Sequence, residues 1–139
     1  MRGTLTCFIC SASFLAACAA NPQPGEPGYP YNLSGSYRVE VLVDGAPYRG
    51  MMELSTAPGG VVNGSFMVTE PVHVAGTVEG AIVADTLDFR MPYEIQENGC
   101  AGVVSGRGGV AEGGGAFSSP VVLDDSCGGE MSGTISIQR

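Results

Sequence analysis

Residues 37–45 read Tyr-Arg-Val-Glu-Val-Leu-Val-Asp-Gly, and this stretch decides the fold that we expect for the chain. Apolar side chains at every second position from Tyr37 to Val43 predict a strand with one buried face. Asp44-Gly45 follows directly and is a strong signal for a two-residue hairpin turn. The alternation resumes from Tyr48 to Thr56, so the domain is expected to open with an antiparallel pair of strands.

The same unit of a short strand and a turn repeats to the C-terminus. Further strands are expected around residues 62–68, 72–83, 87–93, 100–110, 116–122 and 131–138, and helical spacing never exceeds a turn or two. Glycines within several of these strands suit the tight bends of a small closed barrel. The sequence predicts an all-β fold, a small antiparallel up-and-down meander of about eight strands closing as a barrel. A two-sheet β-sandwich is the alternative. Pro92 lies within the fifth strand and is expected to mark an edge, a bulge or a strand end.

The N-terminus carries an export signal. Met1-Arg2 precedes a short apolar run that ends in Leu15-Ala16-Ala17-Cys18, and this run is shorter than the roughly 20 residues that a spanning helix needs. The four residues resemble the lipobox of bacterial lipoproteins; an ordinary signal peptide with a chance cysteine is the alternative. The resemblance implies a signal peptide at 1–17 and a Cys18 that is acylated, as with palmitate, and anchors the chain in the bilayer of the cell envelope. Ala19-Ala20 after the anchor resembles the pattern of lipoproteins sent to the outer membrane, where the domain would face the periplasm.

Residues 18–32 are expected to form the lipidated cysteine and a proline-rich tether, with the β-barrel domain at 33–139. Prolines at 22, 24, 27 and 30 exclude helix and regular strand pairing. An extended polyproline II tether of roughly 40 Å would follow. Tyr29-Pro30-Tyr31 is expected to pack on the domain rather than to serve as a recognition motif.

The cysteines that follow Cys18 form a single pair, Cys100 and Cys127. In an exported chain this pair predicts a disulfide, because strands six and eight of a meander start at the same end. A redox or metal-binding pair would be expected to have the closer C-x-x-C spacing.

Charge narrows the choice of partners. After the signal, five arginines and no lysine face fourteen acidic residues, a formal charge of −9. Such a chain gains nothing from contact with phosphates, so nucleic acid is excluded as a partner. Anionic lipid headgroups should also repel it, so attachment would rest on the acyl chains of Cys18. We expect a monomer.

A catalytic or metal-binding set is not evident, and we predict a protein that is not an enzyme and uses no cofactor. His73 is the only histidine, and Val72 and Val74 beside it place it on the solvent side of its strand. One histidine and one disulfide do not make a zinc site. His73 and methionines 51, 52, 67, 91 and 131 have the soft donor atoms that copper(I) prefers. Core packing is the expected role of these methionines. Asp124-Asp125 with Glu130 is expected to be a solvated loop rather than a calcium site.

A hydrolase would need two carboxylates within about 5–9.5 Å of each other in one cleft.

The predicted architecture resembles that of lipocalin- and avidin-type barrels. Leu33-Ser34-Gly35-Ser36-Tyr37 is similar to the opening strand of avidins, in which a tryptophan usually stands at the position of Tyr37. The chain has no tryptophan, so biotin binding does not carry over. Large rings that could line or plug the barrel are Tyr37, Tyr48, Phe66, Phe89 and Tyr93, and a plugged core is expected for so short a chain.

We therefore expect a lipid-anchored binding or envelope-structural module. One version is a lipocalin-like carrier of a small apolar ligand, which should have a cavity of roughly 300 Å³ or more. The other version meets an envelope protein at its rim loops or on an exposed sheet face and should have a filled core. This second version includes protease inhibition, because bacterial protease-inhibitor lipoproteins have similar barrels. A carboxylate-dependent hydrolase is the rival from another class.

Overall fold

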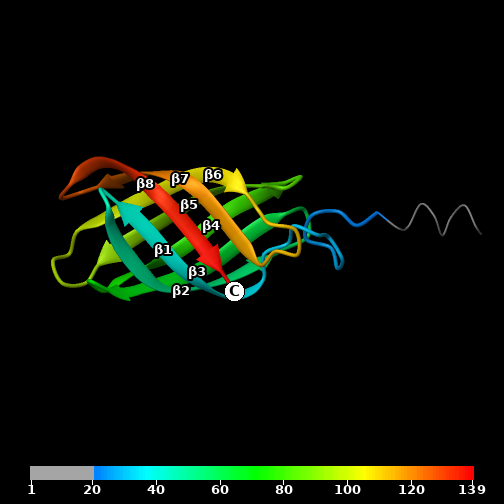
Figure 1. The fold of residues 1–139 in the computed structure, drawn as a ribbon, viewed down its shortest axis with the longest axis horizontal. Helices are drawn as coiled ribbons and strands as arrows, with labels where there is room; N and C mark the ends of the chain where they lie inside the picture. Colours follow the sequence, from blue (N-terminus) through cyan, green and yellow to red (C-terminus); the bar gives the residue numbers. More distant parts are fainter. Residues whose placement is uncertain (1–20) are drawn as a thin grey trace, which may run out of the picture.

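The computed structural model describes residues 21–139 and shows a closed barrel of eight strands in chain order (Figure 1). The strands are β1 (Gly35–Val43), β2 (Ala46–Thr56), β3 (Val61–Glu70), β4 (Val74–Val83), β5 (Thr86–Ile95), β6 (Ala101–Gly109), β7 (Ala116–Asp125) and β8 (Gly129–Gln138). The predicted signal peptide at 1–17, the predicted anchor Cys18 and Ala19-Ala20 lie outside the described residues. In the described part of the chain, we find no helix that is long and apolar enough to cross a membrane.

Each strand pairs with the next one in an antiparallel register, and β1 closes the barrel by pairing with β8 from Arg38↔Gln138 to Val43↔Gly133. The predicted meander and its closure are confirmed, and the alternative of two separate sheets is wrong. Closure satisfies the backbone groups that an open sheet would leave on its first and last strands. Gly133 contributes to closure because a Cβ there would collide with the carbonyl oxygen of Leu42 on the neighbouring strand.

Alternation of side chains places one face of every strand in the core. On β1, the residues from Tyr37 to Val43 that were expected to face inward are buried, while Arg38 faces solvent. Met52 on β2 and Met91 on β5 are buried as expected. Met51 and Met67 are not, since they pair across β2 and β3 on the outer face with 51% and 53% of their surface exposed. The prediction of core packing is therefore wrong for these two methionines.

Pro92 differs from its predicted role at an edge, a bulge or a strand end. It lies inside β5, which continues to Ile95 in a barrel without edges. The pairing of β5 with β4 has a gap between Gly76↔Tyr93 and Glu79↔Arg90, but its register is the same on both sides of that gap. A proline has no backbone N–H to donate, so its strand tolerates it by leaving one stretch of the ladder unpaired.

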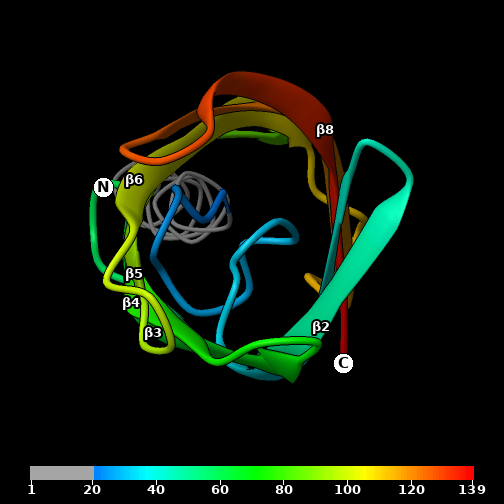
Figure 2. The same ribbon diagram turned by 90° about the vertical axis from the view of Figure 1, so that its left-hand side faces the viewer.

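One end of the barrel, where β1 begins and β8 ends, is closed by residues 21–34, which we call the N-terminal cap. Figure 2 views the barrel from the opposite end, and the cap crosses the ring at the far side. The cap contacts each of the three hairpin loops at this end: Pro24 O accepts from Gly59 N (3.1 Å), Pro30 O accepts from Gly113 N (2.7 Å), and Tyr29 Oη donates to Ala84 O (2.6 Å).

The extended tether predicted for this segment is wrong from residue 22 onward. Asn32 holds the segment in turns, because its Oδ1 accepts from Gly25 N (2.8 Å) and its Nδ2 donates to Glu26 O (2.8 Å). Leu33, which has no exposed surface, then enters the core. Tyr29 and Tyr31 pack against that core, as was predicted for this short motif. The cap is thus part of the folded domain.

The opposite end carries the disulfide. Cys100 and Cys127 are bonded with a Cα–Cα distance of 5.7 Å, as predicted from the direction of strands six and eight. The bond joins the β5–β6 connection to the β7–β8 connection, so it fixes two of the four hairpins that surround this end of the barrel. We call this end the disulfide end.

Candidate functional site

The interior is filled in one half and hollow in the other. In the half near the N-terminal cap, Phe89 and Phe117 meet edge to face with ring centroids 5.4 Å apart, and the remaining void is about 10 Å³. Toward the disulfide end, a pocket of about 110 Å³ lies inside the barrel. Its lining comes from all eight strands and from no residue of the cap: Val41, Val43, Tyr48, Phe66, Val68, Val74, Met91, Tyr93, Ile95, Val104, Leu123, Asp125 and Met131.

Apart from the hydroxyl of Tyr48, the lining is polar only where Tyr93 and Asp125 meet. Tyr93 on β5 donates from Oη to Asp125 Oδ2 on β7 at 2.5 Å, across the intervening strand β6. The other carboxylate oxygen, Oδ1, accepts from the backbone N–H groups of Cys127 (2.8 Å) and Gly128 (2.9 Å). Asp125 therefore belongs to the pocket and to the β7–β8 turn at the same time.

Gly102 on β6 allows this contact. It is the register partner of Tyr93 on one side and of Asp125 on the other. A Cβ at this position would collide with the carbonyl oxygen of Asp124 and would lie 2.7 Å from the Tyr93 hydroxyl oxygen. The absence of a side chain lets the tyrosine lie over β6 and reach the carboxylate.

The hydrogen bond between Tyr93 and Asp125 shifts the pKa values of the two groups in opposite directions. Burial and the hydrogen bond to Asp125 raise the pKa of Tyr93, and the negative charge of Asp125 adds to this shift. The Tyr93 hydroxyl lowers the pKa of Asp125, helped by the N–H groups of Gly128 and Cys127, while burial opposes them. At neutral pH the pocket therefore holds a protonated phenol and an ionised carboxylate.

The structure brings three of the five predicted rings into the pocket. Tyr48, Phe66 and Tyr93 line it. Phe89 lies in the filled half. Tyr37 lies at the capped end, where its hydroxyl donates to Gly114 O (2.7 Å) and the Arg139 guanidinium sits 5.4 Å from its ring centroid.

Asp125 lies in the pocket and not, as predicted, in a solvated acidic loop. Strand β7 continues to Asp125 instead of ending at Val122. Its alternation, with Phe117, Ser119, Val121, Leu123 and Asp125 buried in turn, places the carboxylate inside. Asp124 and Glu130 lie opposite each other in the register of β7 and β8, and both are exposed. Asp124, Asp125 and Glu130 therefore do not lie together. Extending the alternation of β7 by three residues, from Val122 to Asp125, would have predicted that Asp124 faces outward and Asp125 inward.

His73 is exposed at the disulfide end, as predicted. Its Nδ1 lies 2.7 Å from Glu97 Oε1, and its backbone N–H donates to the same carboxylate at 2.9 Å. These hydrogen bonds, the backbone one first, lower the pKa of Glu97. The pair joins the β3–β4 and β5–β6 connections and lies outside the pocket lining.

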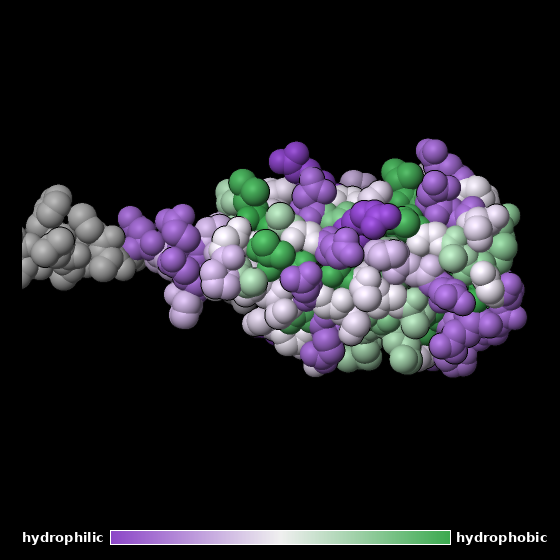
Figure 3. Space-filling view, turned by 180° about the vertical axis from the view of Figure 1, so that it is seen from behind, coloured by the Kyte–Doolittle hydropathy of each residue, from purple (hydrophilic) through white to green (hydrophobic). Residues whose placement is uncertain are grey.

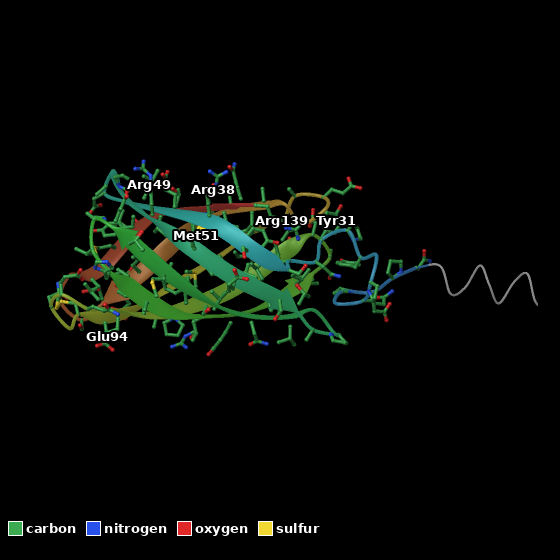
Figure 4. The ribbon with its side chains drawn as sticks, turned by 90° about the horizontal axis from the view of Figure 1, so that it is seen from below. Tyr31, Arg38, Arg49, Met51, Glu94 and Arg139 are labelled. Carbon is green, nitrogen blue, oxygen red and sulfur yellow. A yellow bond between two sulfur atoms is a disulfide. The ribbon has the colours of Figure 1, made fainter. Side chains whose placement is uncertain are left out.

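The outer surface offers a second hollow, a wide groove of about 640 Å³ over β1, β2, β3 and β8. Arg38, Arg49 and Met51 line it and project from the barrel wall in Figure 4. Arg49 Nε binds Glu40 Oε2 at 2.7 Å, so much of the local positive charge is neutralised within the groove. On the face shown in Figure 3, strongly hydrophobic residues form separate spots among hydrophilic ones. The interior pocket is the more distinctive site.

Comparisons with known proteins show the fold and no more. No family model and no curated protein matches the chain. Among solved structures, the redesigned β-barrel b11L5F_LGL is 17% identical, with a TM-score of 0.56 over 77% of this chain and 90% of that one. EF1p2_mFAP2b, solved bound to DFHBI, is 11% identical, with a TM-score of 0.60 over 77% of this chain and 93% of that one. The chain is therefore similar in fold to small β-barrels obtained by protein design.

Proposed function

We propose that this protein is a lipid-anchored binding protein of the cell envelope that holds a small, largely apolar ligand in the pocket at the disulfide end of its barrel. The observation that carries this proposal is a largely apolar pocket with one hydrogen-bonded polar pair, the half-buried Tyr93 and the buried Asp125, in an interior that is otherwise filled. Ligand sites commonly combine an apolar lining with a few placed polar groups that orient the ligand. The solved barrel EF1p2_mFAP2b is bound to DFHBI, so a barrel of similar fold can hold a ligand.

The pocket volume limits the ligand. About 110 Å³ is below the roughly 300 Å³ expected of a lipocalin-like carrier, so the pocket does not meet the expectation for a ligand of that size. The volume approaches the roughly 150 Å³ of an engineered apolar cavity that takes benzene. A single ring or a short alkyl chain therefore fits inside. A longer ligand would extend past the partly exposed residues Tyr48, Ile95 and Met131 toward solvent.

The position of the N-terminus supports the anchored arrangement. Residue 21 lies in the cap, and the pocket lies toward the other end of the barrel. An acyl chain on Cys18, three residues before the described part begins, would hold the capped end toward the bilayer. The pocket would then open away from the membrane surface.

A rival hydrolase finds little support at this pocket. Its lining holds one carboxylate, Asp125, whose pKa is lowered. A glycosidase pair needs two acids, and its general acid requires a raised pKa.

The pocket is tested on the full chain extracted from its own host membranes. Compounds released by denaturation in organic solvent are identified by mass spectrometry for the wild type and for Val104→Phe, which places a ring in the pocket. Val122→Phe is the matched control, because Val122 lies on the outer face of β7 with 47% of its surface exposed. We expect a compound that is present with the wild type and Val122→Phe and absent with Val104→Phe. Equal recovery from all three proteins would contradict the proposal.

The anchor is tested separately. Cys18→Ser should abolish labelling by a radioactive or alkynyl fatty acid and move the protein out of the membrane fraction. Membrane retention without the cysteine would refute acylation of Cys18 as the means of attachment.

A further inference from the structure

We propose that the ligand is a small organic cation, an ammonium group on an apolar body, and that Asp125 binds its charge. This inference rests on the proposed function and narrows the class of ligand that the pocket takes. Four features of the pocket and its surroundings support it.

The first feature is a buried negative charge without a positive partner. Asp125 is 8% exposed, and its three hydrogen-bond donors, the Tyr93 hydroxyl and the N–H groups of Cys127 and Gly128, are all neutral. The ion pairs within residues 21–139 join Arg49 to Glu40, His73 to Glu97 and Arg90 to Glu79, and none of them includes Asp125. Buried carboxylates are rarely left without a cation. A positively charged ligand would supply the charge partner that Asp125 lacks.

The second feature is the remaining capacity of the carboxylate. An ionised carboxylate has about four acceptor sites, and the structure fills three of them. The two backbone donors both bind Oδ1, which leaves Oδ2, shared only with Tyr93, as the oxygen with room for another donor. An ammonium group supplies both the missing proton donor and the missing charge.

The third feature is the aromatic part of the lining. Tyr48, Phe66 and Tyr93 are the rings of a wall that is otherwise aliphatic apart from two methionines and Asp125. Aromatic faces attract cations, and the attraction strengthens when water is excluded. The hydroxyl of Tyr48 has no hydrogen-bonding partner among the residues that the structure describes, so it is also free to accept from a second N–H group.

The fourth feature is the charge around the disulfide end. Besides Asp125, the hairpins and strand ends here carry Asp44, Glu70, Glu94, Glu97, Asp124 and Glu130, and the one histidine, His73, is held by Glu97. Asp124 and Tyr48 are near enough to contribute to the raised pKa of Tyr93. This acidic rim would raise the local concentration of cations and repel anions.

Two other occupants fit less well. An anionic ligand would face Asp125 and the acidic rim at once. A metal ion finds Cys100 and Cys127 beside Asp125, with all three donor atoms within 4.8 Å of one another. The two sulfur atoms are bonded to each other and are not thiolate ligands.

The test uses three probes of similar shape on the full chain in mild detergent at neutral pH: benzylamine, benzyl alcohol and benzoate. Affinities are measured by isothermal titration calorimetry for the wild type, Asp125→Asn and Asp88→Asn. Asparagine at 125 keeps an oxygen that accepts from the β7–β8 turn, while its Nδ2 takes the place of the Oδ2 that accepts from Tyr93, so the charge and that acceptor are removed together. Asp88→Asn makes the same substitution on the exposed face of β5, outside the acidic rim, and is the matched control.

We expect the wild type to bind benzylamine at least tenfold more tightly than benzyl alcohol, because a hydrogen bond between charged groups contributes more than one between neutral groups. Benzoate should bind most weakly, because its carboxylate would face Asp125. Asp125→Asn should lose at least tenfold in affinity for benzylamine and remain within about threefold for benzyl alcohol. Asp88→Asn should change neither affinity by more than about twofold.

Binding of benzyl alcohol as tight as that of benzylamine would overturn the cationic class while leaving the pocket as a ligand site. If Val104→Phe weakens none of the probes that bind, or if no probe binds and no compound co-purifies with the chain, the proposed function itself fails. The ranking of the three probes on the wild type needs no variant, so the inference stays falsifiable even if Asp125→Asn does not fold.

Discussion

Removing the disulfide should destabilise the barrel by an amount that follows from the size of the loop it closes. Cys100 and Cys127 are 27 residues apart in the sequence, and a cross-link of this span lowers the entropy of the unfolded chain enough to stabilise the fold by about 3.5 kcal/mol at 25 °C. For a domain of this size, about 4 °C of melting temperature corresponds to each kcal/mol. Replacing both cysteines by alanine should therefore lower the melting temperature by about 14 °C.

The assay is urea unfolding followed by circular dichroism, with a thermal scan on the same samples. The slope of free energy against urea should rise as the midpoint falls, because the unfolded chain without the cross-link exposes more surface. Wild type treated with dithiothreitol is the control, since it loses the bond and keeps the side chains. A loss below about 1 kcal/mol in both samples, with an unchanged slope, would refute the reasoning from loop entropy.

Two further predictions concern the Tyr93–Asp125 contact. Gly102→Ala should cost about 1–3 kcal/mol of stability, since its Cβ would press on the Asp124 carbonyl oxygen and the Tyr93 hydroxyl. Gly109→Ala, where a Cβ meets nothing within 4 Å, should cost less than about 0.5 kcal/mol in the same urea titration. The lowered pKa of Asp125 means that its ionised form stabilises the fold above its unfolded pKa of about 3.9 and that this contribution is lost as the pH falls below that value. The difference in unfolding free energy between wild type and Asp125→Asn should accordingly shrink from pH 6 to pH 3, and a difference that grows on acidification would be inconsistent with this contact.

The features that could be predicted from sequence are those that short-range patterns determine. The alternation from Tyr37 to Val43 and the Asp44-Gly45 turn define a hairpin without reference to the rest of the chain. Six further repetitions of the same pattern give the strand order, and strand direction then brings Cys100 and Cys127 to one end.

The cap could not be predicted, because its conformation depends on partners that are far away in the sequence. The prolines of residues 21–32 exclude helix and strand, but they do not choose between an extended segment and a series of turns. That choice is made by Asn32 within the segment and by hydrogen bonds to loops near residues 59, 84 and 113.

The pocket could be predicted only in part. Alternation says that Tyr37, Tyr48, Phe66, Phe89 and Tyr93 face inward, but it does not say at which level along the barrel each ring lies. That level follows from the stagger of the strands, which places Tyr37 under the cap and Tyr93 beside the disulfide end. The stagger in turn depends on all eight registers together.

The cap also determines how the contents of the barrel are exchanged. Residues 21–34 close one end of the barrel and side chains fill the half beside it, so the capped end is blocked as a route to the pocket. A ligand of the kind that we propose would then have to leave through the disulfide end before another could enter, and its exchange would follow the unassisted off-rate. A partner that covers this opening would stop loading and release together, and a partner that widens it would accelerate both without changing the affinity of the closed pocket.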